Sequence, residues 1–350
     1  MTCGGWRFRE WGDERIAAQA PPVVADVEAS LALAPRLNPV ASSLGTHTWR
    51  YFSALATLGA IDLTTARVVE PHLDALAILE QADEQADEQA DSAQTEAIGA
   101  GPDSVWGVFA ANGPGHALEA RAAEVPERFT LHGSKPWCSL GDRLTHALVT
   151  AADKGSQRLF AVPLEPGRVS PAEAVWAPAG LAGVRTLPLT FDGAEAVPVG
   201  GPGWYLERPG FAWGGIGVAA VWFGGAAAVA GRLLDAADRR EPDQIALAAL
   251  GRADRSLHCA LLALQDAARA IDAGRAAGAD GITLAARVRA VVAASVDEVL
   301  QTVGHALGPA PLSQDAEHAR RVADLTLYVR QHHAERDLAA LGRCVLGRAA

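Results

Sequence analysis

The 350-residue sequence has little charge, few cysteines and no concentration of basic residues. Charged residues make up 20% of the chain, and 30 Lys and Arg are outnumbered by 41 Asp and Glu, which gives a net charge of −11. Because nucleic-acid binding depends on clustered Lys and Arg that neutralise phosphates, we expect no nucleic-acid partner. The low charge and the 49% of apolar residues are typical of a compact globular protein.

The four cysteines (Cys3, Cys138, Cys259 and Cys344) are far apart and form no C-x-x-C pair. This spacing indicates reduced thiols and offers no zinc-binding motif. The opening stretch MTCGGWRFREWGDER carries charges where a secretory signal needs an apolar core. The sequence therefore predicts a cytoplasmic protein.

One uncharged run, PGFAWGGIGVAAVWFGGAAAVAG (residues 209–231), is long enough to cross a bilayer. It is rich in glycine and alanine, which also allow close helix packing inside a soluble bundle. We interpret it as a buried helix and expect no membrane partner. Its segment GIGVAA (residues 215–220) fits a loose dinucleotide-binding pattern, but no strand precedes it, so we expect no Rossmann site.

Residues 1–103 are predicted to form a helical domain. Within it, residues 44–80 have the apolar periodicity of two helices, the second capped by Asp62 or Thr64. The acidic repeat QADEQADEQADSAQ (residues 81–94) follows, and like charges four residues apart oppose a helix. We interpret this repeat as a solvated linker, with an acidic docking arm as the alternative.

Residues 104–200 contain short β-rich runs separated by Gly, Pro and Asp, with no helix between them. Such spacing predicts an antiparallel barrel or sandwich. Residues 201–350 are rich in Ala, Leu and Arg and are predicted to form a helical bundle. The expected bundle helices are 211–240, 244–277, 281–306 and 313–346. The fold class is thus mainly α with a central antiparallel β domain.

Trp137 and Ser139 stand two residues apart at the end of the β-rich run LHGSKPWCS. Taken alone, the tryptophan could plug a sheet edge while the serine starts a turn. On one strand face, however, a planar aromatic and a small hydroxyl can also hold and polarise a flat redox ring.

This run and the order of helices, β domain and long-helix bundle resemble the acyl-CoA dehydrogenase family of flavoproteins. LHGSKPWCS is similar to the family's Gly-x-Lys-x-Trp-x-Ser/Thr segment. The resemblance implies that Trp137 lies against the isoalloxazine of FAD and that Ser139 hydrogen-bonds the flavin near N5. The run VWGVFAANGPG is similar to a second flavin-contacting strand, which implies contacts from Phe109 and Asn112, although the usual Thr-Glu-Pro reads Asn-Gly-Pro here.

QTVGHALGPAPL (residues 301–312) is similar to the family's Gln-x-x-Gly-Gly-x-Gly turn, in which the backbone lies near the FAD pyrophosphate of a neighbouring subunit. The resemblance implies that Gln301 and Gly304 bind the cofactor and that the chain forms an oligomer. Arg240 resembles a cofactor-binding arginine of the family, but the phenylalanine that follows that arginine is absent here.

Neither family location of the catalytic glutamate holds an acid in this chain. The Tyr-Glu-Gly-Thr segment reads YVRQ (residues 328–331), and the run GGIGVAAVWFGG has no acid. The nearest titratable residues are His332, His333 and Glu335, expected on the last helix. They fit a salt-bridged surface, a relocated acid–base group or a metal site. Adjacent helical histidines point about 100° apart, so we expect no metal.

The resemblance implies an FAD-dependent oxidoreductase that introduces an α,β double bond into an acyl thioester, such as an acyl-CoA, or a related small molecule. The missing glutamate leaves two alternatives open. One is a non-catalytic, flavin-binding subunit of a hetero-oligomeric dehydrogenase. The other is a flavin monooxygenase on the same fold, in which a histidine beside the flavin is more natural than a glutamate. The expected assembly is a homo-oligomer or a hetero-oligomer with a related subunit.

Overall fold

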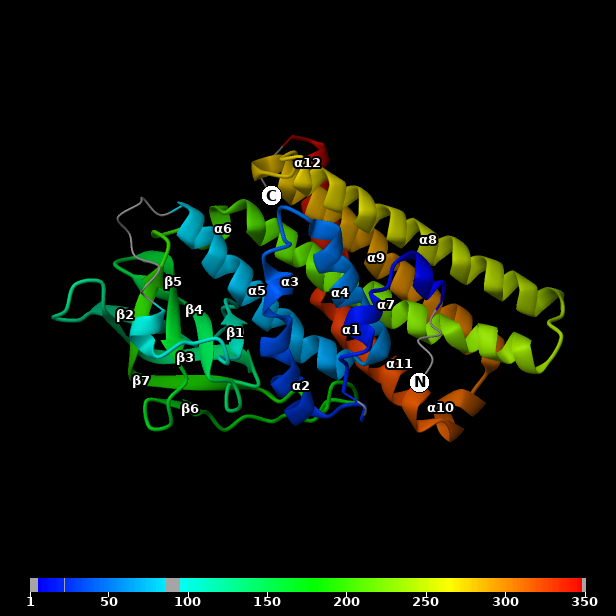
Figure 1. Ribbon diagram of the computed structural model, residues 1–350, viewed down its shortest axis with the longest axis horizontal. Helices are drawn as coiled ribbons and strands as arrows, with labels where there is room; N and C mark the ends of the chain where they lie inside the picture. Colours follow the sequence, from blue (N-terminus) through cyan, green and yellow to red (C-terminus); the bar gives the residue numbers. More distant parts are fainter. Residues whose placement is uncertain (1–5, 22, 86–94, 348–350) are drawn as a thin grey trace.

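The computed structural model describes residues 6–21, 23–85 and 95–347. A β part lies at one end of the molecule and three long helices extend to the other end, with the N-terminal helices packed against the junction (Figure 1). These N-terminal helices are α1 (Glu14–Ala17), α2 (Val27–Leu33), α3 (Asn38–Ala41), α4 (Thr48–Ile61) and α5 (Leu63–Gln85).

Helices α4 and α5 are the two helices expected within residues 44–80. The backbone N–H of Thr65 donates to Asp62 Oδ2 at 3.0 Å, so Asp62 caps α5 as predicted. The linker expected from residue 81 begins inside α5, because Arg208 donates to Gln81 Oε1 and the Trp204 indole donates to Gln85 Oε1. These tertiary contacts offset the repulsion between neighbouring acids. The rest of the acidic repeat lies outside the described residues.

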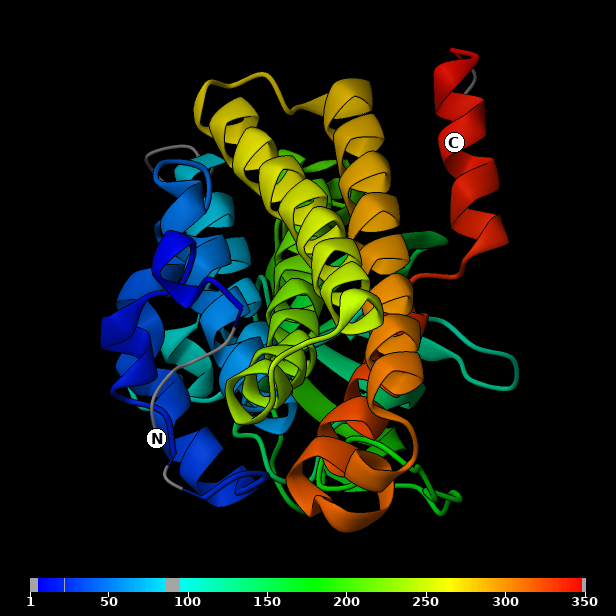
Figure 2. The same ribbon diagram turned by 90° about the vertical axis from the view of Figure 1, so that its right-hand side faces the viewer.

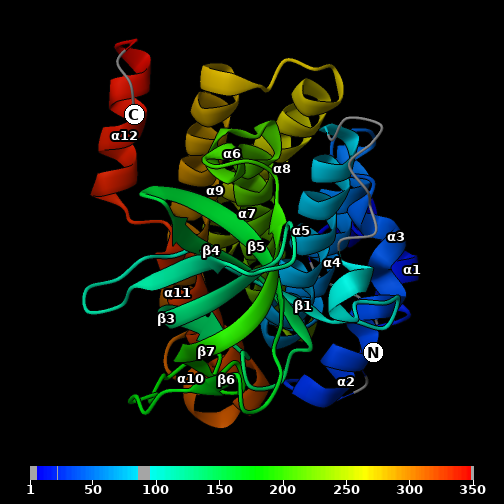
Figure 3. The ribbon, with the colours of Figure 1, turned by 90° about the vertical axis from the view of Figure 1, so that its left-hand side faces the viewer.

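The strands of the described residues form a small barrel, which lies in front of the helices in Figure 3. Strands β4, β2, β3, β7 and β5 pair in that order, and β5 pairs with β4 to close the ring, while β1 extends β4 and β6 extends β7. The strands are β1 (Trp106–Phe109), β2 (Leu118–Ala122), β3 (Phe129–Ser139), β4 (His146–Asp153), β5 (Ser156–Pro163), β6 (Val169–Pro171) and β7 (Thr186–Val199).

The barrel is antiparallel except where β1 and β2 pair with β4. The parallel pairs arise because the chain passes through β2 and β3 before it returns as β4. Strand β4 is buried along most of its length, since one face fills the barrel and the other packs against α5, while β1 pairs with its edge. The barrel is thereby fixed against the helix that carries much of the candidate site.

The C-terminal part begins with the short helix α6 (Trp204–Glu207). Three long helices follow, close to their predicted bounds: α7 (Pro209–Arg239), α8 (Gln244–Asp272) and α9 (Gly278–Leu307). Helix α7 is long and apolar enough to span a membrane, but 83% of its most apolar window is buried inside the protein, as a core helix would be. The loose dinucleotide pattern at residues 215–220 lies wholly inside α7 and lacks the strand and turn that such a site needs.

The single helix predicted over residues 313–346 is wrong. The chain forms α10 (Ala310–Gln314), α11 (Ala316–Tyr328), a 3₁₀ turn over Val329–Gln331 and α12 (Glu335–Val345). Asp315 caps the start of α11, and Ala334 has a positive φ of 46° that no helix continues through. Figure 2 shows α12 standing apart from α11, beside the first half of α9.

Two glycines let α4 and α7 cross closely. A methyl group at Gly224 would overlap the carbonyl oxygen of Ala56, and one at Gly59 would overlap that of Val221. The backbones therefore approach at distances that only glycine allows. Gly59 of α4 and Gly224 of α7 are therefore required by the crossing of the two helices.

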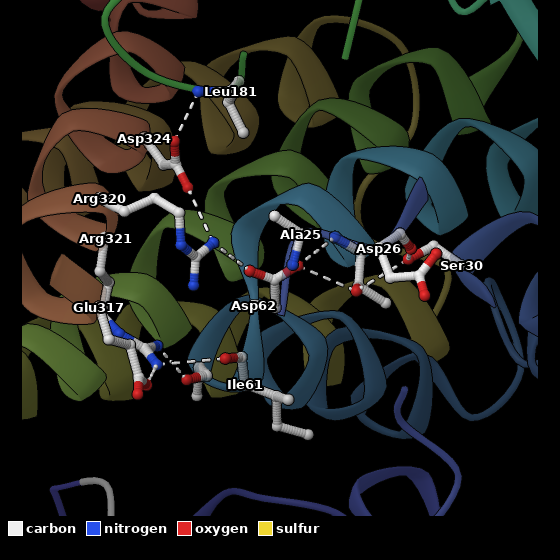
Figure 4. A network of polar contacts seen from close by, with 12 residues as sticks. Ala25, Asp26, Ser30, Ile61, Asp62, Leu181, Glu317, Arg320, Arg321 and Asp324 are labelled. Carbon is white, nitrogen blue, oxygen red and sulfur yellow. Dashed lines mark hydrogen bonds and ion pairs between the residues drawn. The ribbon is translucent and has the colours of Figure 1, made fainter. Parts of the chain in front are cut away.

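A polar network joins α11 to the start of α5 (Figure 4). Arg320 donates to Asp62 at 2.6 Å and to Asp324 at 3.4 Å, and both carboxylates are buried. Asp324 also accepts from the backbone N–H of Leu181 at 2.5 Å. The network therefore sets where α11 lies relative to α5 and to the loop before β7.

Candidate functional site

Strand β3, helix α5 and helix α11 meet through one arginine. Arg67 of α5 donates from Nη2 to Ser139 Oγ and from Nη1 to Glu70 Oε2, both at 3.3 Å. The hydroxyl of Tyr328, at the end of α11, donates to the same Glu70 oxygen at 3.2 Å. The sequence-predicted flavin-side serine is thus two hydrogen bonds away from a buried carboxylate.

Glu70 is suited to exchange a proton near neutral pH. Its side chain is buried, with 8% of the residue exposed. Burial raises the pKa of Glu70 to about 7, although the neighbouring Arg67 favours the charged form. A carboxyl group that titrates near neutrality can either accept or release a proton during a reaction.

Asp74 lies one turn further along the same face of α5. Burial raises its pKa above the ordinary range, with Arg208 opposing the shift. Its Oδ1 lies against α7, where a methyl group on Gly214 would come within 2.6 Å of it. Among the described residues Oδ1 has no hydrogen-bond partner. These residues of α5, with Tyr328 of α11 and the facing part of α7, form one buried surface, the wall. The wall therefore holds a second acid with unused capacity to accept a hydrogen bond.

Arg289 of α9 closes the wall from the other side. It donates to the carbonyl oxygen of Gly215 at 2.7 Å and to that of Gln331 at 3.1 Å. Its guanidinium lies 4.8 Å from the ring centroid of Trp222, which suits a cation–π contact. Arg289 therefore ties α7, α9 and the turn after α11 together around Tyr328.

Tyr51 completes this lining from α4. It is buried, and a methyl group at Gly217 of α7 would come within 3.1 Å of its ring. Burial, reinforced by the charges of Asp74 and Glu70, raises the pKa of the Tyr51 phenol. Tyr51 stays neutral and can serve as a hydrogen-bond donor.

Trp137 lies on the barrel side of this wall with 64% of its surface exposed. The pairing of β3 with β7 shifts register between Lys135 and Cys138, and Trp137 has a positive φ of 60°. This bulge turns the indole outward while its two neighbours stay buried. Its Nε1 would lie 3.7 Å from a methyl group at Gly113, so the ring sits beside the loop after β1.

Ser139 differs in one respect from the expectation of a donor. Thr186 uses its hydroxyl proton on the carbonyl oxygen of Val184 at 3.1 Å. The 2.9 Å contact between Ser139 and Thr186 is therefore donated by Ser139, which also accepts from Arg67. In this arrangement Ser139 has only acceptor capacity left for a ligand.

The remaining barrel-side residues have structural partners. Asn112 accepts a hydrogen bond from Lys135 Nζ at 3.1 Å, and the same ammonium donates to the backbone and side-chain oxygens of Thr150. Burial lowers the pKa of Lys135 to about 8. Phe109 is 4% exposed and packs in the barrel core. Asn112 thus anchors the loop that borders Trp137.

The three predicted catalytic residues separate. His332 is buried near Arg289, and burial lowers its pKa, while its Nε2 has no hydrogen-bond partner among the described residues. His333 is exposed and 3.4 Å from Asp337, and Glu335 is exposed in the first turn of α12. His332 and His333 do not lie on the last helix as expected, because both precede α12. Of the three, His332 borders the wall. Among the described residues no group of three His, Cys, Asp or Glu could hold a metal ion.

Gln301, Gly304 and Arg240 lie in the part of the bundle furthest from the barrel. Arg240 follows α7 and lines a cleft of about 270 Å³ with Ala306 and Leu307 at the end of α9. The ends of these helices and the barrel occupy opposite ends of the molecule (Figure 1). Within one chain, the predicted cofactor-binding residues of the bundle are therefore far from those of the barrel. That both groups bind the same cofactor stays a prediction, and it requires a second copy of the chain.

The sequence analysis missed the wall residues of α5. Arg67, Glu70 and Asp74 are three and four residues apart, so they share one face of a helix whose surroundings are apolar. Charges that recur at helical spacing on an otherwise buried helix were the available signal. Arg289 and Trp222 carried no such signal, because their neighbours come from distant helices.

No protein-family model and no curated protein sequence matches the chain. Solved structures match over nearly the whole length. KijD3, in complex with FMN and dTDP-3-amino-2,3,6-trideoxy-4-keto-3-methyl-D-glucose, has a TM-score of 0.78 at 20% identity and covers 100% of this chain and 95% of its own. Glutaryl-CoA dehydrogenase from Mycobacterium smegmatis has a TM-score of 0.73 at 18% identity, covering 98% and 92%.

The chain has the acyl-CoA dehydrogenase fold. FMN-bound TdsC from Paenibacillus sp. A11-2, a dibenzothiophene monooxygenase, also matches, with a TM-score of 0.73 at 16% identity over 97% of this chain and 94% of its own. The expected order of helices, β domain and helical bundle is thereby confirmed. The acyl-CoA dehydrogenase fold thus accommodates both a dehydrogenase and a monooxygenase among the matched proteins.

Proposed function

We propose that the chain is a flavin-dependent monooxygenase that acts on a small molecule at the wall formed by α5, α7 and α11. The observation that carries the proposal is the contact series Ser139, Arg67, Glu70. It joins the predicted flavin-side residue to a buried acid whose pKa is about 7. When bound, a flavin supplies electron transfer and activation of dioxygen.

The residues present fit a flavin. Trp137 offers a broad, exposed aromatic face, and such a surface is costly in water unless a planar ligand covers it. Ser139 has a free acceptor position beside it, and Arg67 brings a positive charge to the same place. Trp137, Ser139 and Arg67 are the residues that would hold the ring.

Glu70 would hold or accept the proton of the substrate group that is oxidised. Its ionised form is stabilised by Arg67 and by the hydroxyl of Tyr328. An amine or hydroxyl that loses its proton to such a carboxylate becomes a better nucleophile toward oxygen. The buried phenols and arginines around Glu70 would exclude water while this happens.

Two observations favour oxygen transfer over dehydrogenation. Tyr328 is followed by Val329, so the family's Tyr-Glu position holds no base. In addition, KijD3 and TdsC carry FMN, and TdsC is a monooxygenase. Dehydrogenation of an acyl thioester is the second candidate, because Glu70 of α5 is a buried carboxylate that could take the α-proton of the substrate.

FAD, which the resemblance implies, and FMN can be distinguished directly. Protein freed of bound small molecules is titrated with each flavin while tryptophan fluorescence and visible absorbance are recorded. We expect FMN to bind without help from the distant Arg240 region and FAD to bind more tightly only in an oligomer, which light scattering reports. No quenching by either flavin would contradict the proposal for the isolated chain.

The two reactions are separated by where the electrons come from. Under anaerobic conditions butyryl-CoA, octanoyl-CoA and glutaryl-CoA should leave the flavin oxidised. With NADH, a flavin reductase and ¹⁸O₂, a panel of small amines and aromatic compounds should yield a product containing ¹⁸O. Anaerobic bleaching by an acyl-CoA would establish the dehydrogenase instead, and bleaching only in the presence of a related subunit would support the partner-subunit alternative.

A further inference from the structure

Lys135 is a buried lysine directly before the bulge that turns Trp137 outward. It is 2% exposed, and the register shift of β3 against β7 falls between Lys135 and Cys138. Its Nζ donates to Asn112 Oδ1 at 3.1 Å, to the carbonyl oxygen of Thr150 at 2.9 Å and to the Thr150 hydroxyl at 2.7 Å. Lys135 therefore joins the strand that carries Trp137 to β4 and to the loop after β1.

The three oxygen atoms around Nζ all act as acceptors. The Thr150 hydroxyl donates its own proton to the carbonyl oxygen of Ala110 at 3.1 Å, so it can only accept from Lys135. The other two acceptors are an amide oxygen and a backbone carbonyl oxygen. An ammonium has three N–H groups and satisfies all of them, whereas a neutral amine has two N–H groups and a lone pair. Loss of the lysine proton therefore breaks one of these contacts.

The contact that breaks is the one to Asn112. It is the longest of the three, and Asn112 lies on an exposed loop, whereas Thr150 is buried in β4. Water can replace Lys135 as the partner of an exposed amide, but a buried oxygen left without a donor is costly. Deprotonation of Lys135 therefore releases the loop after β1 and leaves the barrel contacts in place.

The released loop lies beside Trp137. A methyl group at Gly113, the residue after Asn112, would lie 3.2 Å from the ring of Pro136 and 3.7 Å from Nε1 of Trp137. One side of the indole therefore borders a loop residue that is one position away from the Lys135 contact. The charged lysine holds this loop against the indole.

The groups around Lys135 allow its charge to change just above neutral pH. Burial lowers the pKa of Lys135 to about 8. Among the described residues, the thiol of Cys138 is the titratable group that acts on it, and burial raises the pKa of that thiol to about 12. His116, further along the loop, contacts Ser134 Oγ at 3.0 Å instead. Lys135 can therefore lose its proton while its neighbours keep theirs.

We propose that Lys135 is a positioning residue for the flavin face: its ammonium holds the loop after β1 against Trp137, and loss of its proton frees the loop and weakens flavin binding. The proposal rests on the proposed function for the identity of the ligand. The link between Lys135 and Trp137 is a property of the chain alone, so the two can be tested by separate measurements.

The first measurement is NMR of the full chain without flavin, labelled with 5-fluorotryptophan and with lysine carrying ¹³C at Cε. The ¹⁹F resonance of Trp137 is the one that is missing from Trp137→Phe. Lys154 is the only other lysine of the chain and is exposed, so the two lysine signals are easily assigned. As the pH rises, the Lys135 signal and the Trp137 resonance should shift together with a midpoint near pH 8.

Three variants locate the link. Lys135→Met should abolish the shift of the Trp137 resonance. Asn112→Ala removes only the loop contact, so the Lys135 signal should still titrate while the Trp137 resonance no longer shifts. Because Asn112 is exposed, this variant keeps the test decisive if Lys135→Met does not fold. Lys154→Met, in the turn between β4 and β5, should behave like the wild type.

The second measurement is fluorescence titration with FMN at about pH 7 and about pH 9. The affinity of the wild type should fall by about three- to tenfold at the higher pH, as expected for the loss of one hydrogen bond. Lys135→Met should bind FMN weakly and equally at both pH values, and Lys154→Met should follow the wild type. Since the pKa of Glu70 is about 7, the titrations are repeated with Glu70→Gln, which should keep the fall.

The proposal is overturned if the Trp137 resonance does not shift near pH 8, or if it shifts in Lys135→Met or Asn112→Ala as in the wild type. It is also overturned if FMN binds the wild type equally at both pH values. A chain that shows the linked shift but binds no flavin at either pH would support the positioning of Trp137 by Lys135 and contradict the proposed function.

Discussion

The barrel edge and the helical wall, which meet at Ser139 and Arg67, depart from ordinary folding in opposite ways. The barrel edge leaves Trp137 64% exposed, whereas the wall buries Glu70 to 8%. An exposed indole loses hydrophobic stabilisation and a buried acid loses hydration, so each arrangement is unfavourable alone. Both are explained if one ligand covers the indole and reacts beside the acid. The comparison shows that an exposed aromatic side chain next to a buried acid, rather than one sequence motif, marks the candidate site.

The largest expected effect concerns the wall. Glu70→Gln keeps the shape and the hydrogen bonds from Arg67 and Tyr328 but cannot take a proton. We expect the rate of ¹⁸O-labelled product formation to fall by about 10² to 10⁴-fold, with flavin affinity unchanged. Glu80→Gln, on an exposed turn of the same helix, is the control. Unchanged turnover in Glu70→Gln would remove the wall from the chemistry.

The next effect concerns the barrel edge. Trp137→Ala removes the exposed stacking face and should weaken flavin binding by about 10 to 100-fold, because stacking on an aromatic side chain contributes about 1–3 kcal/mol. Thermal stability without flavin should stay unchanged, since the indole is mostly exposed. Trp137→Phe should retain most of the affinity in fluorescence titration. If Trp137→Ala unfolds more easily yet binds flavin as before, the indole is a structural plug.

A third change tests the frame that holds the wall. Gly224→Ala forces a methyl group against the carbonyl oxygen of Ala56 and should cost about 1–3 kcal/mol or more of unfolding free energy in urea. Gly251→Ala, in α8, meets no atom within 4 Å and should stabilise by about 0.5–1 kcal/mol. Equal effects of the two changes would show that α4 and α7 do not depend on their close crossing.

The smallest effect is a pH dependence of the unfolding free energy, to which two residues of α5, His72 and Glu70, contribute in opposite directions. His72 accepts from the backbone N–H of Trp106 and lies 2.7 Å from Asn38 Oδ1, so it is held neutral, and burial lowers its pKa to about 4. Between about pH 6 and pH 5 the unfolded histidine gains a proton that the folded one does not. Stability should therefore fall by about 1 kcal/mol over that step. Glu70 acts in the opposite sense, since its raised pKa makes its contribution fall as pH rises from about 4.5 to 7.

Urea unfolding at several pH values, compared with that of His72→Gln, measures this dependence. In His72→Gln the unfolding free energy should no longer fall between about pH 6 and pH 5. His47→Gln, at an exposed position before α4, should show the same fall as the wild type. A wild-type slope that survives in His72→Gln would assign the acid sensitivity to other groups.

The fold and the barrel edge could be predicted from the sequence because their signals are local. Trp137 and Ser139 are two residues apart, and each long helix of the bundle has its own apolar period. The wall could not be predicted, since Glu70, Trp222 and Arg289 are brought together only by the crossing of α5, α7 and α9. The break before α12 was also hidden, because the helical pattern continues through Ala334 although its backbone leaves the helix.

The Arg320 network has a mechanical consequence. Arg320 of α11 donates to Asp62, the residue just before α5, and to Asp324 one turn further along its own helix, so α11 is fixed to the start of α5. Glu70 lies on α5 and Tyr328 lies on α11. The hydrogen bond between them therefore depends on an ion pair in which neither residue takes part. Any motion that separates the start of α5 from α11 therefore has to break the Arg320–Asp62 ion pair.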